Sequence, residues 1–487
     1  METTRAEPVR EQPNRIETDD SVIVLGAGPA GLGTALGVSL NSVGRPVWIL
    51  EKKSTPGGLA GSFLWNGHSI DYGPHRLSPN LRHVRVLAKE LLGPDCLINK
   101  SQHGVHFNGR LYQFPPRIID WLSLGPVWEI ISFAFSFLAA KLNWIVHRFE
   151  PENFQATITA RFGRRFYRAV VAPMAEKVWI KPDDIDPAFV EQRFALVHPM
   201  AVLKKTIFPR QELNPSIFYY PRNGFQQLWD NMASYLKRDG QNIRYDALPS
   251  KLEIRQDRIV RVEYVQGGIT HHLEGKGLQV VSTIPIVALL GIMTGIDVGP
   301  LLEKARRAKF RSMFLVAMEF DQPQTLPYRT IIFPEKKYRF NRLFEQNKYS
   351  RATVIDGKSV IVADITYPRG GDEARLSDAE IIEGVREDIK KLPYIDESRI
   401  IGAHVERVEF AYVVPDLESR RCFYEIHHEL KKIPNLYLTG RFSIGEYDNS
   451  DFAIDHGLAL GAALAGRTSQ LEYLMVQHEN RDRNIVG

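Results

Sequence analysis

Three glycines near the start of the chain have the spacing that lets a phosphorylated ligand approach the backbone. Gly26, Gly28 and Gly31 form the pattern G-x-G-x-x-G. Residues without a Cβ atom allow a tight turn and leave backbone N–H groups open to a pyrophosphate. Glu51 follows Gly31 by 20 positions, where a carboxylate accepts hydrogen bonds from both hydroxyls of a ribose. Its negative charge disfavours a 2′-phosphate, and therefore NADP.

The surrounding sequence predicts the βαβ unit that must position this turn. Residues 21–25 and 46–50 are short apolar runs typical of buried strands, and residues 29–41 have the small-residue pattern of a helix. The N-terminus of that helix adds partial positive charge next to the phosphates. The residues that we expect at this end of a dinucleotide are Gly26, Gly28, Pro29, Ala30, Gly31, Glu51 and Lys52.

A second glycine-rich loop distinguishes FAD from NAD. Residues 56–61 (PGGLAG) follow the acid directly, and a plain NAD site does not need such a loop; an ordinary hairpin loop is the alternative. Residues 70–76 (IDYGPHR) then form a sharp bend suited to lie against an isoalloxazine ring. The flavin contacts expected from these two segments are Gly58, Leu59, Ala60, Gly73, Pro74 and His75.

This order of motifs resembles the flavin amine oxidase superfamily, whose members carry GxGxxG, E, GG-x-x-G and D-x-G-x-H near the N-terminus. Segments 162–163 with 175–179, 219–224 and 437–441 further resemble the branch that contains UDP-galactopyranose mutases and protoporphyrinogen-oxidase-like proteins. The resemblance implies an α/β fold, in which a Rossmann-type FAD-binding domain is interleaved with an α+β substrate domain. That second domain would contain a mainly antiparallel sheet and a helical subdomain.

The resemblance also implies a second cofactor segment near the C-terminus, after a strand at 436–438. It places Gly440 and Arg441 at the pyrophosphate and flavin end, and it directs a helix beginning at 451–454 towards the cofactor. The residues implied there are Asp451, Phe452 and Ala453. The sequence departs from the mutases, whose paired tyrosines and arginines for a nucleotide diphosphate are not matched by a motif. Residues 73–75 (GPH) also replace a G-G-H segment that the mutases often carry.

The element pattern and the resemblance together divide the chain into seven segments. We expect a loose arm at 1–20, FAD-binding segments at 21–90, 221–290 and 431–470, a helical substrate subdomain at 91–220, a substrate-domain sheet at 291–430 and a tail at 471–487. Within them the apolar spacing predicts helices at 154–178, 226–236, 377–391 and 452–464, and strands at 243–265, 277–283, 313–320 and 360–367. Ser377 and Asp378 are capping residues for the third helix.

Three residues are candidates for catalysis. His75 lies in the bend and titrates near neutral pH, so it is either a proton acceptor or flavin-tuning group, or a structural histidine bonded to a carbonyl. Arg222, in the turn YPRNG, either binds an anionic group or is a surface arginine. Tyr447 either faces the cofactor or belongs to an ordinary turn.

Charge and cysteine usage exclude several classes of partner. The net charge is +5, and the basic residues are interleaved with acidic ones, so we expect no nucleic-acid partner. The only cysteines, Cys96 and Cys422, suggest neither a disulfide framework nor a metal site. This usage fits a cytoplasmic location, and the first 20 residues lack the apolar region of a signal peptide.

One apolar stretch, 122–146, raises the question of membrane association. Glu129, Lys141 and Pro126 interrupt it, which favours a buried or amphipathic helix. A peripheral contact with a membrane is the alternative.

These observations predict an FAD-dependent oxidoreductase that dehydrogenates an organic small molecule by hydride transfer to flavin N5. One alternative is a redox-neutral sugar mutase or isomerase, as the resemblance suggests. A second is a desaturase of a lipophilic, isoprenoid-like substrate, and a third is a scaffold that has lost its cofactor. The sequence specifies neither the substrate, nor the electron acceptor, nor the oligomeric state.

Overall fold

The glycine turn belongs to a five-stranded parallel sheet that the chain visits three times. In the computed structural model, which describes residues 14–78, 81–114, 127–147, 153–186, 189 and 217–466, the strand order is β10-β3-β2-β14-β21. All neighbours in this sheet are parallel. The strands are β2 (Val22–Leu25), β3 (Val47–Leu50), β10 (Asn242–Arg244), β14 (Gln279–Ser282) and β21 (Leu436–Leu438). The predicted Rossmann-type, interleaved α/β fold is confirmed.

Two helices from opposite ends of the chain pack on this sheet with their backbones in contact. They are α1 (Pro29–Asn41) and α16 (Ser450–Leu464). A Cβ atom added at Gly461 would lie 2.7 Å from Gly37 Cα and would overlap the backbone oxygen of Thr34. One added at Gly33 would lie 2.7 Å from the backbone oxygen of Ile454. Glycine is therefore required on both helices, because any side chain would force them apart.

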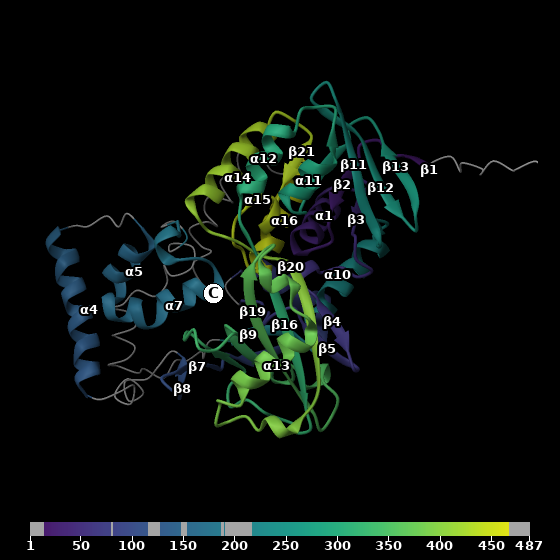
Figure 1. The fold of residues 1–487 in the computed structure, drawn as a ribbon. Helices are drawn as coiled ribbons and strands as arrows, with labels where there is room; N and C mark the ends of the chain where they lie inside the picture. The colour runs from purple at the N-terminus through teal and green to yellow at the C-terminus, as the bar shows by residue number, and fades with distance from the viewer. Residues whose placement is uncertain are drawn as a thin grey trace, which may run out of the picture.

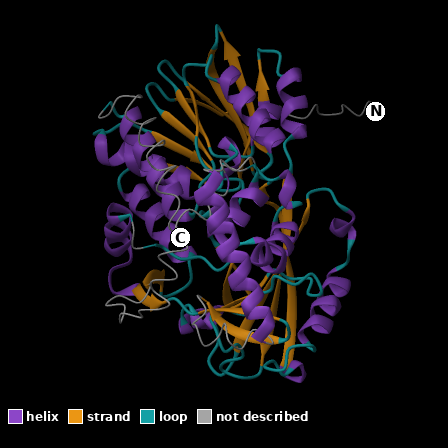
Figure 2. Ribbon diagram, turned by 90° about the vertical axis from the view of Figure 1, so that its left-hand side faces the viewer, coloured by secondary structure: helices purple, strands orange, loops and turns teal. Residues whose placement is uncertain are grey.

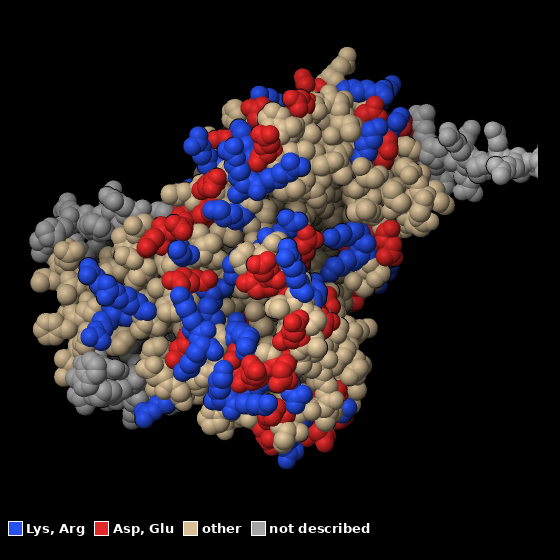
Figure 3. Space-filling model, viewed as in Figure 1, with Lys and Arg blue, Asp and Glu red and all other residues tan. Residues whose placement is uncertain are grey.

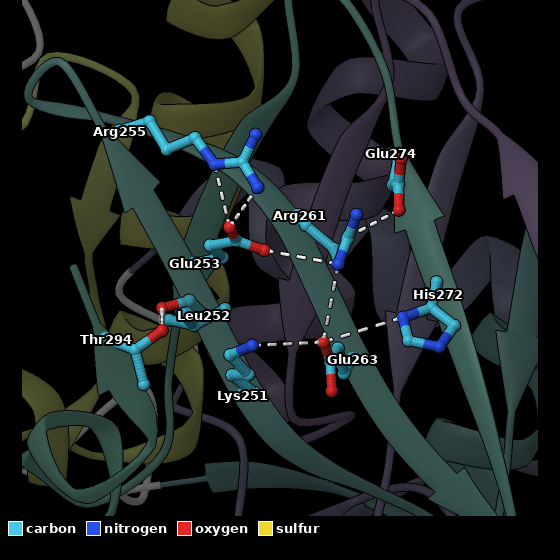
Figure 4. A network of polar contacts seen from close by, with 9 residues as sticks. All are labelled: Lys251, Leu252, Glu253, Arg255, Arg261, Glu263, His272, Glu274 and Thr294. Atoms are coloured by element: carbon cyan, nitrogen blue, oxygen red, sulfur yellow. Dashed lines mark hydrogen bonds and ion pairs between the residues drawn. The ribbon is translucent and has the colours of Figure 1, made fainter.

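A second sheet, β1-β13-β12-β11-β15, adjoins the parallel sheet. Its strand β1 (Asn14–Glu17) pairs in parallel with β13, so this part of the expected loose arm is in fact a strand. The other strands are β11 (Ala247–Arg255), β12 (Arg258–Gln266), β13 (Ile269–Glu274) and β15 (Met293–Thr294). The outer face of the sheet carries alternating charges: Arg261 contacts Glu253 at 3.3 Å, and Glu263 contacts Lys251 at 3.4 Å (Figure 4).

The other half of the molecule is built on a seven-stranded sheet of order β20-β16-β19-β18-β17-β7-β8 (lower half of Figure 1). Its neighbours are antiparallel except β17 and β7. The strands are β7 (His103–Phe107), β8 (Arg110–Phe114), β16 (Phe310–Phe320), β17 (Thr330–Ile332), β18 (Arg342–Glu345), β19 (Ser359–Pro368) and β20 (Ile400–Val413). Helix α13 (Asp378–Ile389) packs on it and begins with the predicted cap at Ser377, which forms a full capping box with Glu380.

A helical lobe projects to one side of both sheets (left in Figure 1). It contains α4 (Val127–His147), α5 (Phe154–Phe162), α6 (Arg164–Phe166), a π-helical turn (Tyr167–Val171) and α7 (Ala172–Val178). The single helix predicted at 154–178 is wrong, because Gly163 takes a φ of +88° and interrupts it. Residues 122–126 of the apolar stretch lie outside the described residues. Among the described helices, none is both long and apolar enough to span a membrane.

The remaining elements connect these parts, and Figure 2 shows strands gathered towards two ends of the molecule with helices between and around them. Two small antiparallel pairs are β4 (Ser62–Trp65) with β5 (His68–Asp71), and β6 (Cys96–Lys100) with β9 (Ile217–Pro221). The other helices used below are α2 (Arg82–Leu92), α10 (Gln226–Arg238), α11 (Ile286–Ile292), α12 (Gly299–Arg307), α14 (Leu417–Leu430) and α15 (Arg441–Ile444). Apolar residues of α11, α12 and α14 share one buried core with strands β2, β3 and β14.

Candidate functional site

Four loops that are distant in sequence meet at the carboxyl edge of the parallel sheet. Gly26 follows β2, Glu51 follows β3, Thr283 follows β14 and Gly440 lies just beyond β21. A Cβ atom added at Gly440 would lie 3.1 Å from the Cβ of Ala30 and 3.6 Å from that of Thr283. The early glycine turn and the late Gly-Arg pair therefore touch, as the sequence predicted. Ligands of open α/β sheets bind at this edge.

The three fingerprint glycines differ in what surrounds them. A Cβ atom at Gly26, where φ is +103°, would lie 2.5 Å from Thr283 Oγ1, and one at Gly31 would overlap the Gly26 carbonyl oxygen. A Cβ atom at Gly28 would meet nothing within 4 Å. Gly28 is also the N-cap of α1 and offers no side chain to its N–H groups, and Pro29 follows in the first turn. The middle glycine thus opens onto free space in front of a helix N-terminus, as a pyrophosphate requires.

Glu51 is buried beside this turn and is fixed by two backbone groups. Its Oε2 accepts a hydrogen bond from Ala27 N at 2.7 Å, and its Oε1 accepts one from Lys53 N at 2.9 Å. Each carboxylate oxygen keeps a lone pair for a further donor, such as a ribose hydroxyl. The side chain of the neighbouring Lys52 is exposed.

The second glycine-rich loop lies directly on the first turn. Gly57 N donates to Ala27 O at 2.8 Å, and a Cβ atom at Gly58 would lie 3.4 Å from Gly28 Cα. Helix α10 holds the loop from behind, because the Trp229 indole N–H donates to Ala60 O at 2.6 Å. The loop is therefore part of the same cradle rather than a separate hairpin.

A buried carboxylate anchors the bend that follows. Asp71 accepts hydrogen bonds from Ser62 Oγ (2.7 Å), Tyr220 Oη (2.6 Å) and Phe225 N (3.1 Å), and Gln346 Nε2 donates to Tyr220 Oη at 2.9 Å. Burial raises the pKa of Asp71 to about 6, against the effect of these donors. Asp71 thus connects the D-x-G-x-H segment (residues 71–75) to the YYPRNG segment (residues 219–224). Tyr220 itself is buried in the core.

His75 is held in the bend by two main-chain carbonyls, because its backbone N donates to Gly73 O at 2.7 Å and its ring binds a second carbonyl. Its Nε2 lies 2.9 Å from Leu59 O, and its ring stacks on Phe225 with centroids 5.3 Å apart. A carbonyl oxygen only accepts, so Nε2 carries the proton and Nδ1 keeps its lone pair. Burial is the main cause that lowers the pKa of His75 to about 4, and the positive charges of Arg441 and Arg342 contribute to this shift. This geometry matches the alternative of a structural histidine bonded to a carbonyl. Gly73 and Pro74 directly precede His75 in the bend. The role of His75 as a proton acceptor stays a prediction.

Two other predicted residues are engaged by protein groups. Arg222 is half exposed at the end of β9 and forms an ion pair with Asp95 at 2.8 Å, which is the surface alternative. The Arg441 guanidinium donates to Asp448 O at 2.5 Å and to Ala411 O at 3.2 Å. Contact of Arg441 with a phosphate therefore stays a prediction.

The start of α16 faces the same edge of the sheet. Asp451 is buried, its carboxylate accepts a hydrogen bond from Phe452 N at 3.2 Å, and burial raises its pKa to about 6. Phe452 and Ala453 are buried, and Ala453 N donates to Asn449 O at 2.9 Å.

Arg342, Tyr412, Arg441 and Tyr447 form a group that we call the arginine–tyrosine cluster. Arg441 and Tyr447 were expected from the sequence but Arg342 and Tyr412 were missed, and the catalytic role of Tyr447 stays a prediction. Tyr412 and Tyr447 stack with an interplanar angle of 13° and centroids 6.2 Å apart. Arg441 lies over the Tyr447 ring at 4.6 Å, and Arg342 Nη2 lies 3.5 Å from Tyr412 Oη. Arg342 Nε also donates to the buried Asp364 at 2.5 Å.

All four members of this cluster are partly exposed, and Arg342 is also close enough to influence both His75 and His103. Its positive charge helps burial to lower the pKa of each histidine to about 4. Arg342 is positioned by the cross-strand register of β18 with β19, which opposes it to Asp364. No motif encodes that register.

Comparisons with known proteins agree with this geometry. The model of the family described as flavin containing amine oxidoreductase matches residues 30–453. Coproporphyrinogen III oxidase of Staphylococcus aureus is 24% identical over 264 residues, which are 49% of this chain and 55% of that protein. Phytoene dehydrogenase of Streptomyces griseus is 47% identical over 55 residues, 11% of this chain and 10% of that protein. The matched segments thus span about half of the first relative and a tenth of the second.

Solved structures share the fold over almost the whole chain. Reduced UDP-galactopyranose mutase has a TM-score of 0.78 at 18% identity, covering 96% of this chain and 98% of that one. A proposed protoporphyrinogen oxidase from Exiguobacterium sp. has a TM-score of 0.66 at 17% identity, with coverages of 95% and 99%. The resemblance seen in the sequence is confirmed. The chain belongs to the flavin containing amine oxidoreductase family and is a flavoprotein enzyme.

Proposed function

We propose that the flavin is FAD and that the enzyme dehydrogenates an organic small molecule. The observation that carries this proposal is the open space in front of Gly28. This space lies at the sheet edge where the loop after β2 meets the loop after β21. Glu51 lies at the end of the adjacent strand β3. A carboxylate at that place suits the ribose of an adenosine, which FAD has and a flavin mononucleotide lacks.

The residues present fit this ligand from end to end. The N–H groups of Ala30 and Gly31 open α1 without a side-chain cap and can donate to the phosphates. Thr439 Oγ1, at the end of β21, is buried without a hydrogen-bond partner among the described residues, as a group awaiting a ligand would be. The loop at 56–61 and the bend at 70–76 extend the cradle towards the seven-stranded sheet.

The bound flavin would supply a hydride acceptor at N5. The chain's own residues would orient the substrate: Arg342 and Arg441 offer positive charge, and Tyr412 and Tyr447 offer two parallel ring faces. The pKa of His75 is lowered to about 4, so the imidazole is uncharged at neutral pH and its Nδ1 can accept a hydrogen bond from the substrate. This combination suits a substrate with a ring or unsaturated system and an anionic or strongly polar group.

A redox-neutral sugar mutase is the second candidate, and the arginine–tyrosine cluster favours it. The resemblance associates paired tyrosines and arginines with binding of a nucleotide diphosphate in the mutases. Here two tyrosines and two arginines from β18, β20 and the segment 441–447 come together. The two candidates differ in whether electrons leave the enzyme.

Two measurements test the proposal. The visible spectrum and the mass of the released cofactor identify FAD. Anaerobic bleaching of the flavin is then followed with nucleotide sugars, amines, porphyrinogens and polyprenes. Bleaching by one class supports the dehydrogenase, whereas turnover that requires prior reduction and gives no net oxidation supports the mutase.

Matched variants link the reaction to the cluster. Arg342→Gln should retain the flavin spectrum but slow bleaching by the active substrate at least about tenfold, because a charged hydrogen bond is lost. Tyr447→Phe keeps the ring stack and removes only the hydroxyl, so it separates packing from chemistry. Arg222→Gln is the control, since its ion pair with Asp95 is exposed. Equal losses in Arg342→Gln and Arg222→Gln would contradict a role for the cluster.

A further inference from the structure

One face of α4 exposes apolar side chains to solvent. Between residues 131 and 142, every exposed side chain is apolar. The largest are Phe135, Leu142, Leu138 and Ile131, which are 72%, 65%, 62% and 56% exposed. They recur at helical spacing, with Ala134 and Ala139 between them. They form one continuous stripe, which we call the α4 face.

The orientation of this stripe is fixed by contacts on the opposite side of the helix. Ser136 Oγ accepts a hydrogen bond from Arg165 N at 3.1 Å. A Cβ atom added at Gly163 would lie 2.8 Å from the backbone of Ser136 and 2.9 Å from that of Phe137. Helix α4 is therefore locked against α5 and α6 through its small residues, and the α4 face is left outside.

The charged side chains described on α4, α5, α6 and the π-helical turn are all basic, whereas the next part of the lobe adds the acidic Glu176, Asp183 and Asp184. The described side chains of residues 131–143 and 153–171 include five basic groups and no acidic group. The basic residues are Lys141, Arg161, Arg164, Arg165 and Arg168. Arg164, Arg165 and Arg168 are exposed, and Figure 3 shows Lys and Arg side chains directly beside the tan surface of the lobe. Elsewhere basic and acidic residues alternate, as they do on β11 to β13 (Figure 4).

We propose that the α4 face rests on the surface of a lipid bilayer that contains anionic lipids. Aliphatic and aromatic side chains in a stripe enter the boundary between headgroups and acyl chains, and the exposed arginines of the adjoining α6 and π-helical turn bind phosphate headgroups. A second copy of the chain is a poor occupant, because a symmetric contact would bring the two groups of arginines together. The contact is independent of the reaction that the enzyme catalyses.

Flotation of the flavin-loaded enzyme with vesicles tests this proposal. Vesicles of phosphatidylcholine with phosphatidylglycerol should carry the protein, and pure phosphatidylcholine should carry much less. Phe135→Ser/Leu138→Ser should weaken binding at least about tenfold through lost apolar burial. Arg164→Gln/Arg165→Gln/Arg168→Gln should weaken it by roughly fivefold per charge, and added salt should do the same to the wild type.

The control and the light-scattering mass complete the experiment. Leu64→Ser/Leu417→Ser removes two side chains that are 82% and 62% exposed on other elements, and it should bind vesicles like the wild type. The proposal is overturned if the wild type does not float with anionic vesicles or if both double variants lose binding equally. A wild-type dimer that Phe135→Ser/Leu138→Ser converts to a monomer would also overturn it, because a second copy would then cover the α4 face.

Discussion

The carboxyl edge of the parallel sheet and the helical lobe use helices in opposite ways. At the sheet edge, α1 and α16 touch through glycines, and most of their side chains are buried. In the lobe, α4 rests on its neighbours through Ser136 and leaves its larger apolar side chains in solvent. Backbone contact at these glycines leaves α1 little freedom to move against α16, so the N-terminus of α1 is held in place at the sheet edge. An exposed stripe contributes little to folding, so its apolar surface remains available to a partner.

The largest effect should come from filling the contact between α1 and α16. Gly461→Ala adds a Cβ atom that would lie 2.6 Å from Val38 N and 2.7 Å from Gly37 Cα. Because backbone rather than a flexible side chain is in the way, we expect a loss of about 3 kcal/mol or more of the free energy of unfolding. Denaturant titration measures it.

The matched control is a helical glycine with room around it. Gly291 in α11 is exposed, and a Cβ atom there would meet nothing within 4 Å. Gly291→Ala should raise the free energy of unfolding by about 0.5 to 1 kcal/mol, since alanine favours helix and restricts the unfolded chain. If the two variants had equal stability, the close packing of α1 on α16 would be refuted.

The next effect separates binding from folding at the same edge. Gly28→Val places a branched side chain in the open space before α1, where the backbone φ of −72° suits valine. We expect a colourless protein with the circular dichroism of the folded chain, because the substitution obstructs the pyrophosphate and not the protein. Gly291→Val should stay yellow. Flavin at wild-type occupancy in Gly28→Val would contradict the placement of the phosphates.

A smaller effect should follow from the loss of one charge. Glu51→Gln keeps the volume of the side chain but weakens the acceptor for a ribose and for Ala27 N. We expect FAD to bind about 1 to 3 kcal/mol more weakly, as measured by equilibrium dialysis or fluorescence titration. Lys52→Gln, a change at the exposed neighbouring residue, is the control. A comparable loss in Lys52→Gln would show that the effect is not specific to the Glu51 carboxylate.

The smallest effect concerns the ion pair between α2 and α16. His83 Nε2 lies 2.5 Å from Asp455 Oδ1, and this contact raises the pKa of His83. A raised histidine pKa stabilises the folded chain below the unfolded value of about 6.5, and the contribution is lost as pH rises through the folded value. Since His83 is half exposed, His83→Gln should cost only about 0.5 kcal/mol at pH 5.5 and almost nothing at pH 9. Urea unfolding of both proteins at pH 5.5 and pH 9 measures this cost. A larger loss of stability at pH 9 than at pH 5.5 would contradict the prediction.

Local patterns predicted the parts of the site that depend on neighbouring residues. The glycine turn, Glu51 and the second loop follow from spacing within one βαβ unit, and the structure brings them together. The cap at Ser377 followed from the residue type at the start of the predicted helix. Each depends on contacts that are short in sequence, so residue type and spacing were sufficient.

The family resemblance predicted one contact between distant segments, that of Gly440 with the first glycine turn, but other long-range contacts could not be predicted from the sequence. Arg222 was a candidate ligand for an anion, but it forms an ion pair at the surface with Asp95, which lies 127 positions away in the sequence. The break at Gly163 depends on the backbone of α4 passing beside it. Arg342 could be found only by knowing the register of β18 on β19. In each case tertiary packing decided the outcome, and the residues themselves carry no local signal of it.

The order in which strands join the parallel sheet has a consequence for biosynthesis. Strand β21 and helix α16 are the last described elements, yet they form one wall of the cradle that β2 begins. While the ribosome is still adding residues before 436, a growing chain lacks that wall, and the edge of β14 that pairs with β21 is uncovered. We expect stable capture of the cofactor only after residues 436–464 have been added.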